Sequence, residues 1–206
     1  PTPFGGGDSF KQQSFAMPSQ PQAVELEENI VGQYHDTYIL VETDEGLEIV
    51  DQHIAQERYI YEKLKSEKNI VSQMLFVSDV IQLSSTDAAL IKENIEKFGY
   101  GIEFLNDTEL IFRKVPQLLA KVNPKEIIAD ILENIEGDID NLEEKILITT
   151  SCKASVKANT KLSVWQMQDI IKKWRTTKMP YTCPHGRPIC KFFPHKEIAA
   201  FFQRSK

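Results

Sequence analysis

Residues 37–57 read TYILVETDEGLEIVDQHIAQE, and this stretch decides the fold. Its two runs at 37–43 and 47–50 are rich in β-branched and aromatic residues, and they flank a short acidic turn that ends in glycine. That pattern predicts a β-hairpin. Helical composition with apolar residues four apart follows at 55–65. The hairpin should therefore deliver Asp51 to a junction between a strand and a helix.

The chain on either side of this stretch carries clear local signals. Residues 1–27 are built largely from Pro, Gly, Ser and Gln without a sustained period, which is typical of a linker. Downstream we expect a strand at 74–81, a capped helix after Ser84, a hairpin at 101–113, helices at 123–137, 143–158 and 164–175, a loop at 181–188 and a short helix begun by Pro194. These elements predict an α/β protein of the α+β kind.

Bulk composition excludes several classes of protein. At 206 residues and 41% hydrophobic, the chain is long enough to bury a substantial core. Its formal charge of −6 argues against a protein that holds DNA mainly through a broad basic surface. No apolar run is long enough to span a bilayer and no signal pattern opens the sequence, so we expect a cytoplasmic protein without a membrane partner. The three cysteines fit reduced thiols better than a disulfide framework.

Asp51, His53 and Glu57 form the first candidate cluster. Residues four apart lie on one face of a helix, so His53 and Glu57 can face one ion if the helix already includes His53. Asp51 can reach the same point from the end of the strand. The alternative is a helix start that favours acidic residues for its dipole, with His53 incidental.

A second cluster lies in the loop at 181–188. Cys183 and His185 place a sulfur and an imidazole nitrogen side by side on a proline-stiffened loop, which suits Zn²⁺ and related ions. The alternative is a tight turn with a buried cysteine and an exposed histidine. Residues 151–153 form a third candidate element, in which Cys152 could be simply a small buried apolar residue, or its neighbour Lys153 could face a phosphate.

Four short elements in this sequence resemble the conserved motifs of the MutL family. Residues 51–62, DQHIAQERYIYE, are similar to the family's endonuclease motif D-Q-H-A-x-x-E-x-x-x-x-E, with Ile54 where the family usually has alanine. Residues 151–153, SCK, resemble its A-C-R element, and 183–188, CPHGRP, match its C-P-H-G-R-P element in full. Residues 202–204, FQR, resemble its F-x-R element.

The resemblance implies a C-terminal domain made of two parts. A dimerisation subdomain with the metal site would comprise 28–68 and 143–206, and an external or regulatory subdomain would be inserted at 69–142. Residues 1–27 would link this domain to an ATPase region of the GHKL class, so that ATP is a ligand of that missing region only.

The resemblance also implies a function, namely nicking of one DNA strand in mismatch repair. Catalysis would depend on Asp51, His53 and Glu57. Glu57, Cys183 and His185 would hold one Zn²⁺, His53 with Cys152 would complete or orient a second position, and Asp51 would be the essential carboxylate. Activity would need Mn²⁺ or Mg²⁺. Glu62 would act behind the ligands or in a salt bridge. Lys153, Arg187 and Arg204 are the candidates for contacting DNA.

The partners implied are a second copy of the chain, duplex DNA bound weakly by this domain alone, the sliding clamp, and the mismatch-recognition protein MutS through the parent protein. A bacterial, nucleoid-associated protein would fit this set. Gln73 and Leu75 match a clamp-binding peptide in which Val77 replaces the usual proline, although the same residues could form a strand with a buried Leu75 and Phe76.

Two other functions remain open. The chain could be a dimerisation and docking module whose zinc only stabilises the fold. More remotely, it could be a redox or metal sensor that uses Cys152 and Cys183.

Overall fold

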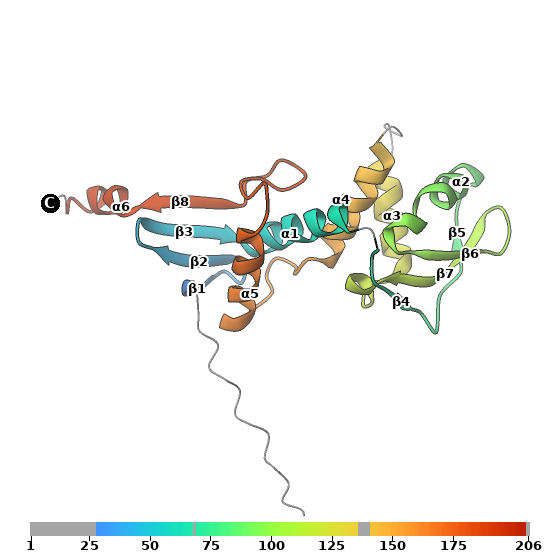
Figure 1. Ribbon diagram of the computed structural model, residues 1–206, viewed down its shortest axis with the longest axis horizontal. Coiled ribbons are helices and arrows are strands. Elements are labelled where there is room, and N and C mark those ends of the chain that lie inside the picture. Colours follow the sequence, from blue (N-terminus) through green and yellow to red (C-terminus); the bar gives the residue numbers. More distant parts are fainter. Residues whose placement is uncertain (1–27, 68, 136–140, 205–206) are drawn as a thin grey trace, which may run out of the picture.

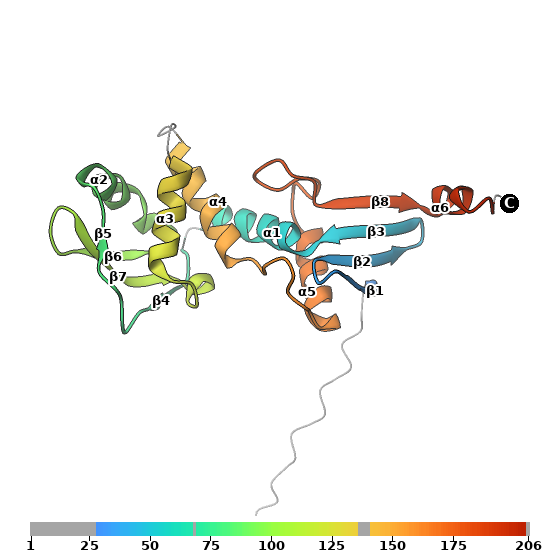
Figure 2. The same cartoon turned by 180° about the vertical axis from the view of Figure 1, so that it is seen from behind.

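The computed structural model describes residues 28–67, 69–135 and 141–204. It confirms the predicted α+β class, because helices accompany two separate antiparallel sheets. The molecule is elongated, with one sheet towards each end and the helices α1 (Gln52–Ser66) and α4 (Leu142–Ala154) between them (Figure 1, and from behind in Figure 2).

The first sheet has the strand order β1 (Asn29–Tyr34), β2 (Tyr38–Thr43), β3 (Gly46–Asp51) and β8 (Cys190–Pro194). The predicted hairpin is confirmed as β2 and β3, whose turn lies between Thr43 and Gly46. A Cβ atom on Gly46 would lie 2.2 Å from the carbonyl oxygen of Phe193. The close approach of β8 to β3 at this position therefore requires glycine. Strand β8 was not predicted from the sequence, and it pairs with β3 from far along the chain.

Helix α1 begins at Gln52, three residues before the predicted start at 55. The earlier start has a local cause, because Asp51 caps the helix. Its Oδ1 atom accepts a hydrogen bond of 3.0 Å from the backbone N–H of Ile54. His53 is therefore helical, and the condition for His53 and Glu57 to share one face is met.

The second sheet has the order β4 (Ser72–Met74), β7 (Glu109–Pro116) and β5 (Ile81–Gln82), and β6 (Gly101–Phe104) also pairs with β7. Around it lie α2 (Ser85–Asn94), α3 (Pro124–Ile135) and the 3-10 turns η1 (Glu96–Phe98) and η2 (Gln117–Leu119). The second hairpin and the cap of α2 by Ser84 are confirmed. The predicted end of α3 near residue 137 lies outside the described residues.

The prediction of one strand at 74–81 is wrong. Only its two ends pair with β7, in β4 and β5, and the segment between them leaves the sheet. Phe76 is 101% exposed and Val77 is 87% exposed, so neither side chain packs against the core. Apolar composition alone suggested a strand, but the apolar residues do not all face the core.

Helices α5 (Val164–Arg175) and α6 (His195–Phe201) follow the prediction, whereas α4 ends early. Helix α5 has the predicted bounds, and Ser163 and Gln166 form a capping box at its start. Helix α6 follows Pro194 as expected. Helix α4 ends at Ala154 rather than at 158, and the chain then continues in an extended conformation at Ser155.

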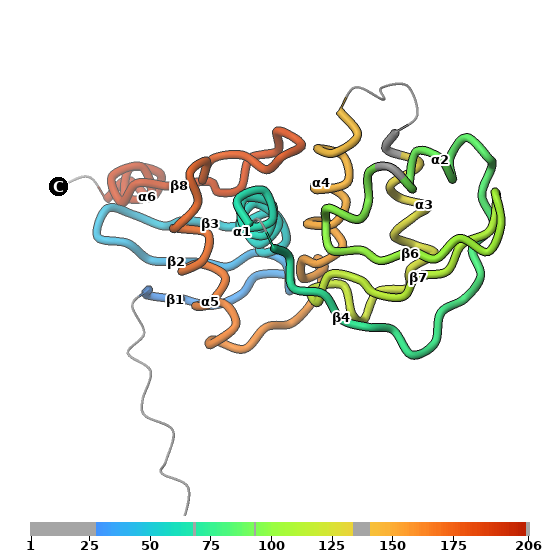
Figure 3. Tube along the Cα trace, turned by 45° about the vertical axis from the view of Figure 1, so that its right-hand side comes forward, coloured from blue at the N-terminus to red at the C-terminus, as the bar shows by residue number. Residues whose placement is uncertain are grey.

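Two hydrophobic cores hold the fold together, and α1 contributes to both. Ile54 and Ala55, in its first turn, pack in a core with β2, β3 and α5. Ile60 and Leu64, further along, pack in the second core with β7, α2, α3 and α4. Figure 3 shows α1 and α4 in the centre, between the two sheets. Throughout the ranges that the structure describes, no helix is long and apolar enough to cross a membrane.

Candidate metal centre

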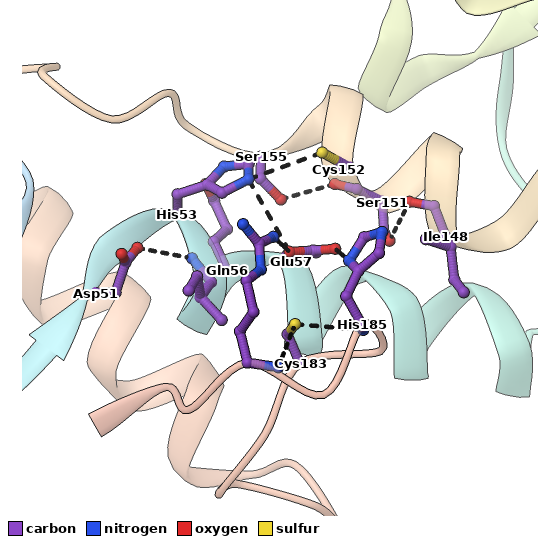
Figure 4. Close-up of polar contacts among 12 residues, drawn as sticks. Asp51, His53, Gln56, Glu57, Ile148, Ser151, Cys152, Ser155, Cys183 and His185 are labelled. Carbon is purple, nitrogen blue, oxygen red and sulfur yellow. Dashed lines mark hydrogen bonds and ion pairs between the residues drawn. The ribbon is translucent and has the colours of Figure 1, made fainter. Parts of the chain in front are cut away.

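Glu57 is the centre of the candidate site. Its side chain is fully buried on α1 and faces the loop that joins α5 to β8 (Figure 4). Arg187 Nη2 lies 3.4 Å from its Oε2 atom, and His185 Nδ1 lies 2.9 Å from its Oε1 atom. The His185 contact lacks hydrogen-bond geometry, so Oε1 is a buried carboxylate oxygen without a hydrogen-bond partner. Such an oxygen is costly to bury unless a cation binds to it.

The loop that carries Cys183 and His185 is a tight turn stabilised by its own backbone. The N–H of Cys183 donates to the carbonyl of Arg187, and Gly186 takes a positive φ of 82° that favours glycine. The backbone N–H groups of His185 and Arg187 both point at Cys183 Sγ, at 3.3 and 3.4 Å. Donors aimed at sulfur complement the negative charge that a metal-bound thiolate carries.

Ligand atoms of Glu57, Cys183 and His185 all lie within 4.8 Å of one another. Among the described residues, this is the one group of three or more acidic, histidine or cysteine side chains that could hold a metal ion. One oxygen, one sulfur and one nitrogen form a set that suits zinc, with a further coordination position left open. The orphaned oxygen of Glu57 supports the fit, because a cation there would supply its missing partner.

His53 and Cys152 flank the same carboxylate. His53 Nε2 lies 3.7 Å from Cys152 Sγ and 3.9 Å from Glu57 Oε2. His53 Nδ1 lies 2.9 Å from the carbonyl oxygen of Val156. A carbonyl can only accept, so Nδ1 carries the proton of the neutral ring, and the lone pair of Nε2 faces Cys152 and Glu57. Burial, with the charge of Glu57 in addition, raises the pKa of the Cys152 thiol.

Asp51 lies apart from this group. In Figure 4 its carboxylate lies at the left, away from Glu57, Cys183 and His185, and its dashed line leads to a backbone nitrogen of α1. The alternative reading of Asp51, as an acidic residue at a helix start, therefore describes its contact in this structure. One oxygen caps the helix, which leaves the other oxygen for a ligand or a water molecule.

Residues 31–162 match the model of the MutL C-terminal dimerisation domain. The chain belongs to this family. A protein of Clostridium botulinum strain Kyoto, named DNA mismatch repair protein MutL, is 34% identical over 196 residues, which cover 90% of this chain and 29% of the relative. A protein of Clostridium beijerinckii with the same name is 37% identical over 185 residues, covering 85% of this chain and 28% of the relative. The chain thus spans less than a third of the length of these relatives.

The basic residues that the MutL motifs single out lie in three different places. Arg187 is beside the cluster, paired with Glu57, and its side chain is 52% exposed. Lys153 turns to α3, where its Nζ atom lies 2.7 Å from Asp130. Arg204 follows α6 at the opposite end of the first sheet from the Cys183 loop (Figure 1). Only Arg187 is brought to the candidate metal centre within one chain.

Glu62 has a structural contact of its own. It faces Arg58 at 3.8 Å and accepts hydrogen bonds from the backbone N–H groups of Lys178 and Met179. The predicted salt bridge is present, and the carboxylate also holds the chain that leaves α5.

The segment that resembles the clamp-binding peptide is accessible. Gln73 is exposed on β4, Leu75 is half-buried against the second core, and Phe76 projects into solvent. The alternative of a strand with Leu75 and Phe76 both buried is therefore wrong for Phe76.

Sequence reasoning missed the groups that hold His53. The Val156 carbonyl is a backbone atom and carries no sequence signal. The Val156 N–H donates to Gln56 Oε1 at 2.6 Å, and Gln56 lies inside the MutL motif at a position that the motif leaves variable. A polar residue on the helix face beside His53 was the one available hint.

Proposed function

We propose that this chain is the part of a MutL protein that dimerises and cuts one strand of DNA in mismatch repair, in a metal-dependent reaction. The observation that carries the proposal is the buried Glu57 carboxylate, whose orphaned oxygen faces Cys183 and His185. Family membership supports it, because the relatives are named as mismatch repair proteins and the matched region as a dimerisation domain.

The residues divide into three roles in this proposal. Glu57, Cys183 and His185 hold one ion, for which zinc suits the ligand set. His53 and Cys152 form or orient a second position, and the free oxygen of Asp51 serves as the essential carboxylate. Bound divalent ions supply an activated water and stabilise charge on the phosphate oxygens, and Mn²⁺ or Mg²⁺ is the ion that the family resemblance implies for activity.

In this proposal a few basic side chains contact DNA, and no broad basic surface is involved. Arg187 is the basic side chain beside the centre, and it can turn from Glu57 to a phosphate because its side chain is half exposed. Lys153 and Arg204 contact DNA only if the path of the duplex, or a second subunit, reaches them. With a net charge of −6, the isolated chain binds DNA weakly, so the ATPase region and MutS would bring DNA to it.

A surface on the first sheet supports dimerisation. Strand β1 is an edge strand with Val31 and Tyr34 exposed, and α5, which contacts β1, exposes Val164 and Trp165. Exposed apolar side chains on adjoining elements mark an interaction surface. In this proposal the surface binds a second copy of the chain.

The exposed segment at 71–77 supports docking of the sliding clamp. Its apolar side chains at Met74, Phe76 and Val77 have no cover in the described part of the chain. The clamp would contact the side chains of Gln73 and Leu75, and Phe76 would enter an apolar pocket of the clamp.

The test is a nicking assay on supercoiled plasmid with Mn²⁺, using the full-length parent protein with and without the clamp. Asp51→Asn is the decisive variant, because asparagine caps a helix as well as aspartate does and the fold of α1 is kept. Asp87→Asn is the matched control, since Asp87 is also an acidic residue beside a helix start, in α2.

We expect nicking by the parent and by Asp87→Asn, and loss of nicking in Asp51→Asn with the dimer intact. Wild-type nicking by Asp51→Asn would overturn the catalytic assignment. Absence of nicking in all three proteins, with zinc bound, would favour a dimerisation and docking module with a structural zinc.

A further inference from the structure

We infer that Gln56 is a positioning residue that sets the ring of His53 through the backbone of Val156. The inference deepens the proposed metal site, and it does not depend on whether the protein cuts DNA. Three side chains of α1 bind the segment that follows α4, namely those of Gln52, His53 and Gln56.

Gln56 and His53 hold both polar groups of one residue. The Val156 N–H donates to Gln56 Oε1 at 2.6 Å, and the Val156 carbonyl accepts from His53 Nδ1 at 2.9 Å. Residues three apart on a helix are neighbours on its surface, so Gln56 and His53 form hydrogen bonds to Val156 from the same helix face. If the Gln56 bond is lost, the carbonyl that orients His53 is free to move.

The rest of the segment is tied down independently. The fully buried Gln52 donates from Nε2 to the carbonyls of Lys157 and Thr160, at 3.1 and 3.0 Å. Gln33 on β1 donates to the same Thr160 carbonyl and accepts from the N–H of Leu162. These contacts keep residues 157–162 in place when Gln56 is changed, so a Gln56 variant should alter the Val156 peptide while the fold is kept.

Loss of the Gln56 hydrogen bond would change which nitrogen of His53 carries no proton and where that nitrogen points. With its proton on Nδ1, the ring presents the lone pair of Nε2 to Cys152 and Glu57, which is the form that binds a metal ion. Without the Val156 acceptor, the proton can move to Nε2 and the ring can rotate. Gln56 thus acts on the metal centre without touching it.

Three variants test this inference. Gln56→Met has similar length and lacks the acceptor, whereas Gln56→Glu keeps an oxygen for the Val156 N–H. Gln166→Met is the matched control, because Gln166 Oε1 also accepts from a backbone N–H, that of Ser163, at the start of α5. Thermal unfolding monitors the fold of each variant.

The first readout is the tautomer of His53 in the metal-free chain, measured by long-range ¹H–¹⁵N NMR at about pH 8, above the ordinary pKa of a free histidine. Wild type, Gln56→Glu and Gln166→Met should show the proton on Nδ1, and Gln56→Met should lose this preference. A Gln56→Met chain with the wild-type tautomer would overturn the inference.

The second readout is zinc affinity at the position that His53 and Cys152 form or orient, measured by competition with a chelator. Gln56→Met should weaken zinc binding by about tenfold, the scale found for groups that orient metal ligands, and Gln56→Glu should restore it. The double variant Gln56→Met/His53→Ala should bind zinc as His53→Ala does, because Gln56 acts through His53. Additive losses would show that Gln56 acts by another route and would refute the positioning role. These results stand even if plasmid nicking fails, so the two proposals fail separately.

Discussion

Replacing Glu57 by glutamine should make the metal-free protein more stable and the zinc-bound protein less stable. The Glu57 carboxylate is fully buried and one oxygen has no hydrogen bond, while Arg187, the permanent cation beside it, is itself half exposed. The loss of water around the charge is therefore only partly offset. Glutamine has the same shape without the charge, so the free energy of unfolding without metal should rise by about 1 kcal/mol.

Zinc should reverse this order. At a free zinc concentration one hundred times the wild-type Kd, binding adds about 2.7 kcal/mol to the stability of the wild type. If loss of the carboxylate ligand raises the Kd about 100-fold, the variant gains only about 0.4 kcal/mol at the same concentration. The wild type should then be the more stable protein by about 1.3 kcal/mol.

Urea unfolding with and without zinc measures both differences. Glu62→Gln is the control on the same helix, because Glu62 holds the backbone of Lys178 and Met179 and should lose the same stability under both conditions. A metal-free Glu57→Gln protein that is less stable than wild type by about 3 kcal/mol or more would refute the reasoning. That result would mean that Arg187 and His185 hold Glu57 in a structural ion pair.

Three further predictions follow from the surfaces and thiols. Trp165→Glu on the exposed face of α5 should weaken dimerisation at least tenfold in analytical ultracentrifugation, and an unchanged dimer would exclude this surface. Phe76→Ser should reduce clamp binding in surface plasmon resonance and change the free energy of unfolding by less than about 0.5 kcal/mol, since Phe76 makes no buried contact; equal clamp binding would remove this segment from the interface. Burial raises the pKa of Cys190 to about 11 from 9.0, so the folded state favours the neutral thiol, and the stability present below pH 9 is lost as the pH rises towards 11. Two pKa units correspond to about 2.7 kcal/mol, and because the Cys190 side chain is only partly buried we expect Cys190→Ala to remove about 1 kcal/mol of pH-dependent loss in unfolding titrations. Identical pH profiles would contradict the assignment.

Local features of the sequence were sufficient to predict most of the helices and turns. The hairpin of β2 and β3, the cap of α2 by Ser84 and the bounds of α5 depend on residues within a few positions of one another. Capping and hairpin signals act over such distances, because the hydrogen bonds they describe close within one turn. The same holds for the Cys183 turn, which its own prolines and glycine predict.

Pairing between distant segments could not be predicted in this way. Strand β8 exists because β3 offers it an edge, and its own short sequence, which ends in proline, carries no strong strand pattern. The segment at 74–81 shows the opposite case. Its apolar residues suggest a strand, but β7 accepts only its two ends and leaves Phe76 in solvent.

The candidate metal centre likewise depends partly on local sequence and partly on contacts between distant residues. The sequence by itself determined which residue types are present, and its motifs already single out Glu57, Cys183 and His185 as ligands. Only the tertiary structure decided that these three side chains converge, that Asp51 caps α1 apart from them, and that Lys153 turns to Asp130. It also showed that the Val156 peptide, held by Gln56, orients His53. The physical reason is that a ligand set is a matter of distances between atoms, and packing of α1 against α4 and α5 sets those distances across more than one hundred residues of chain.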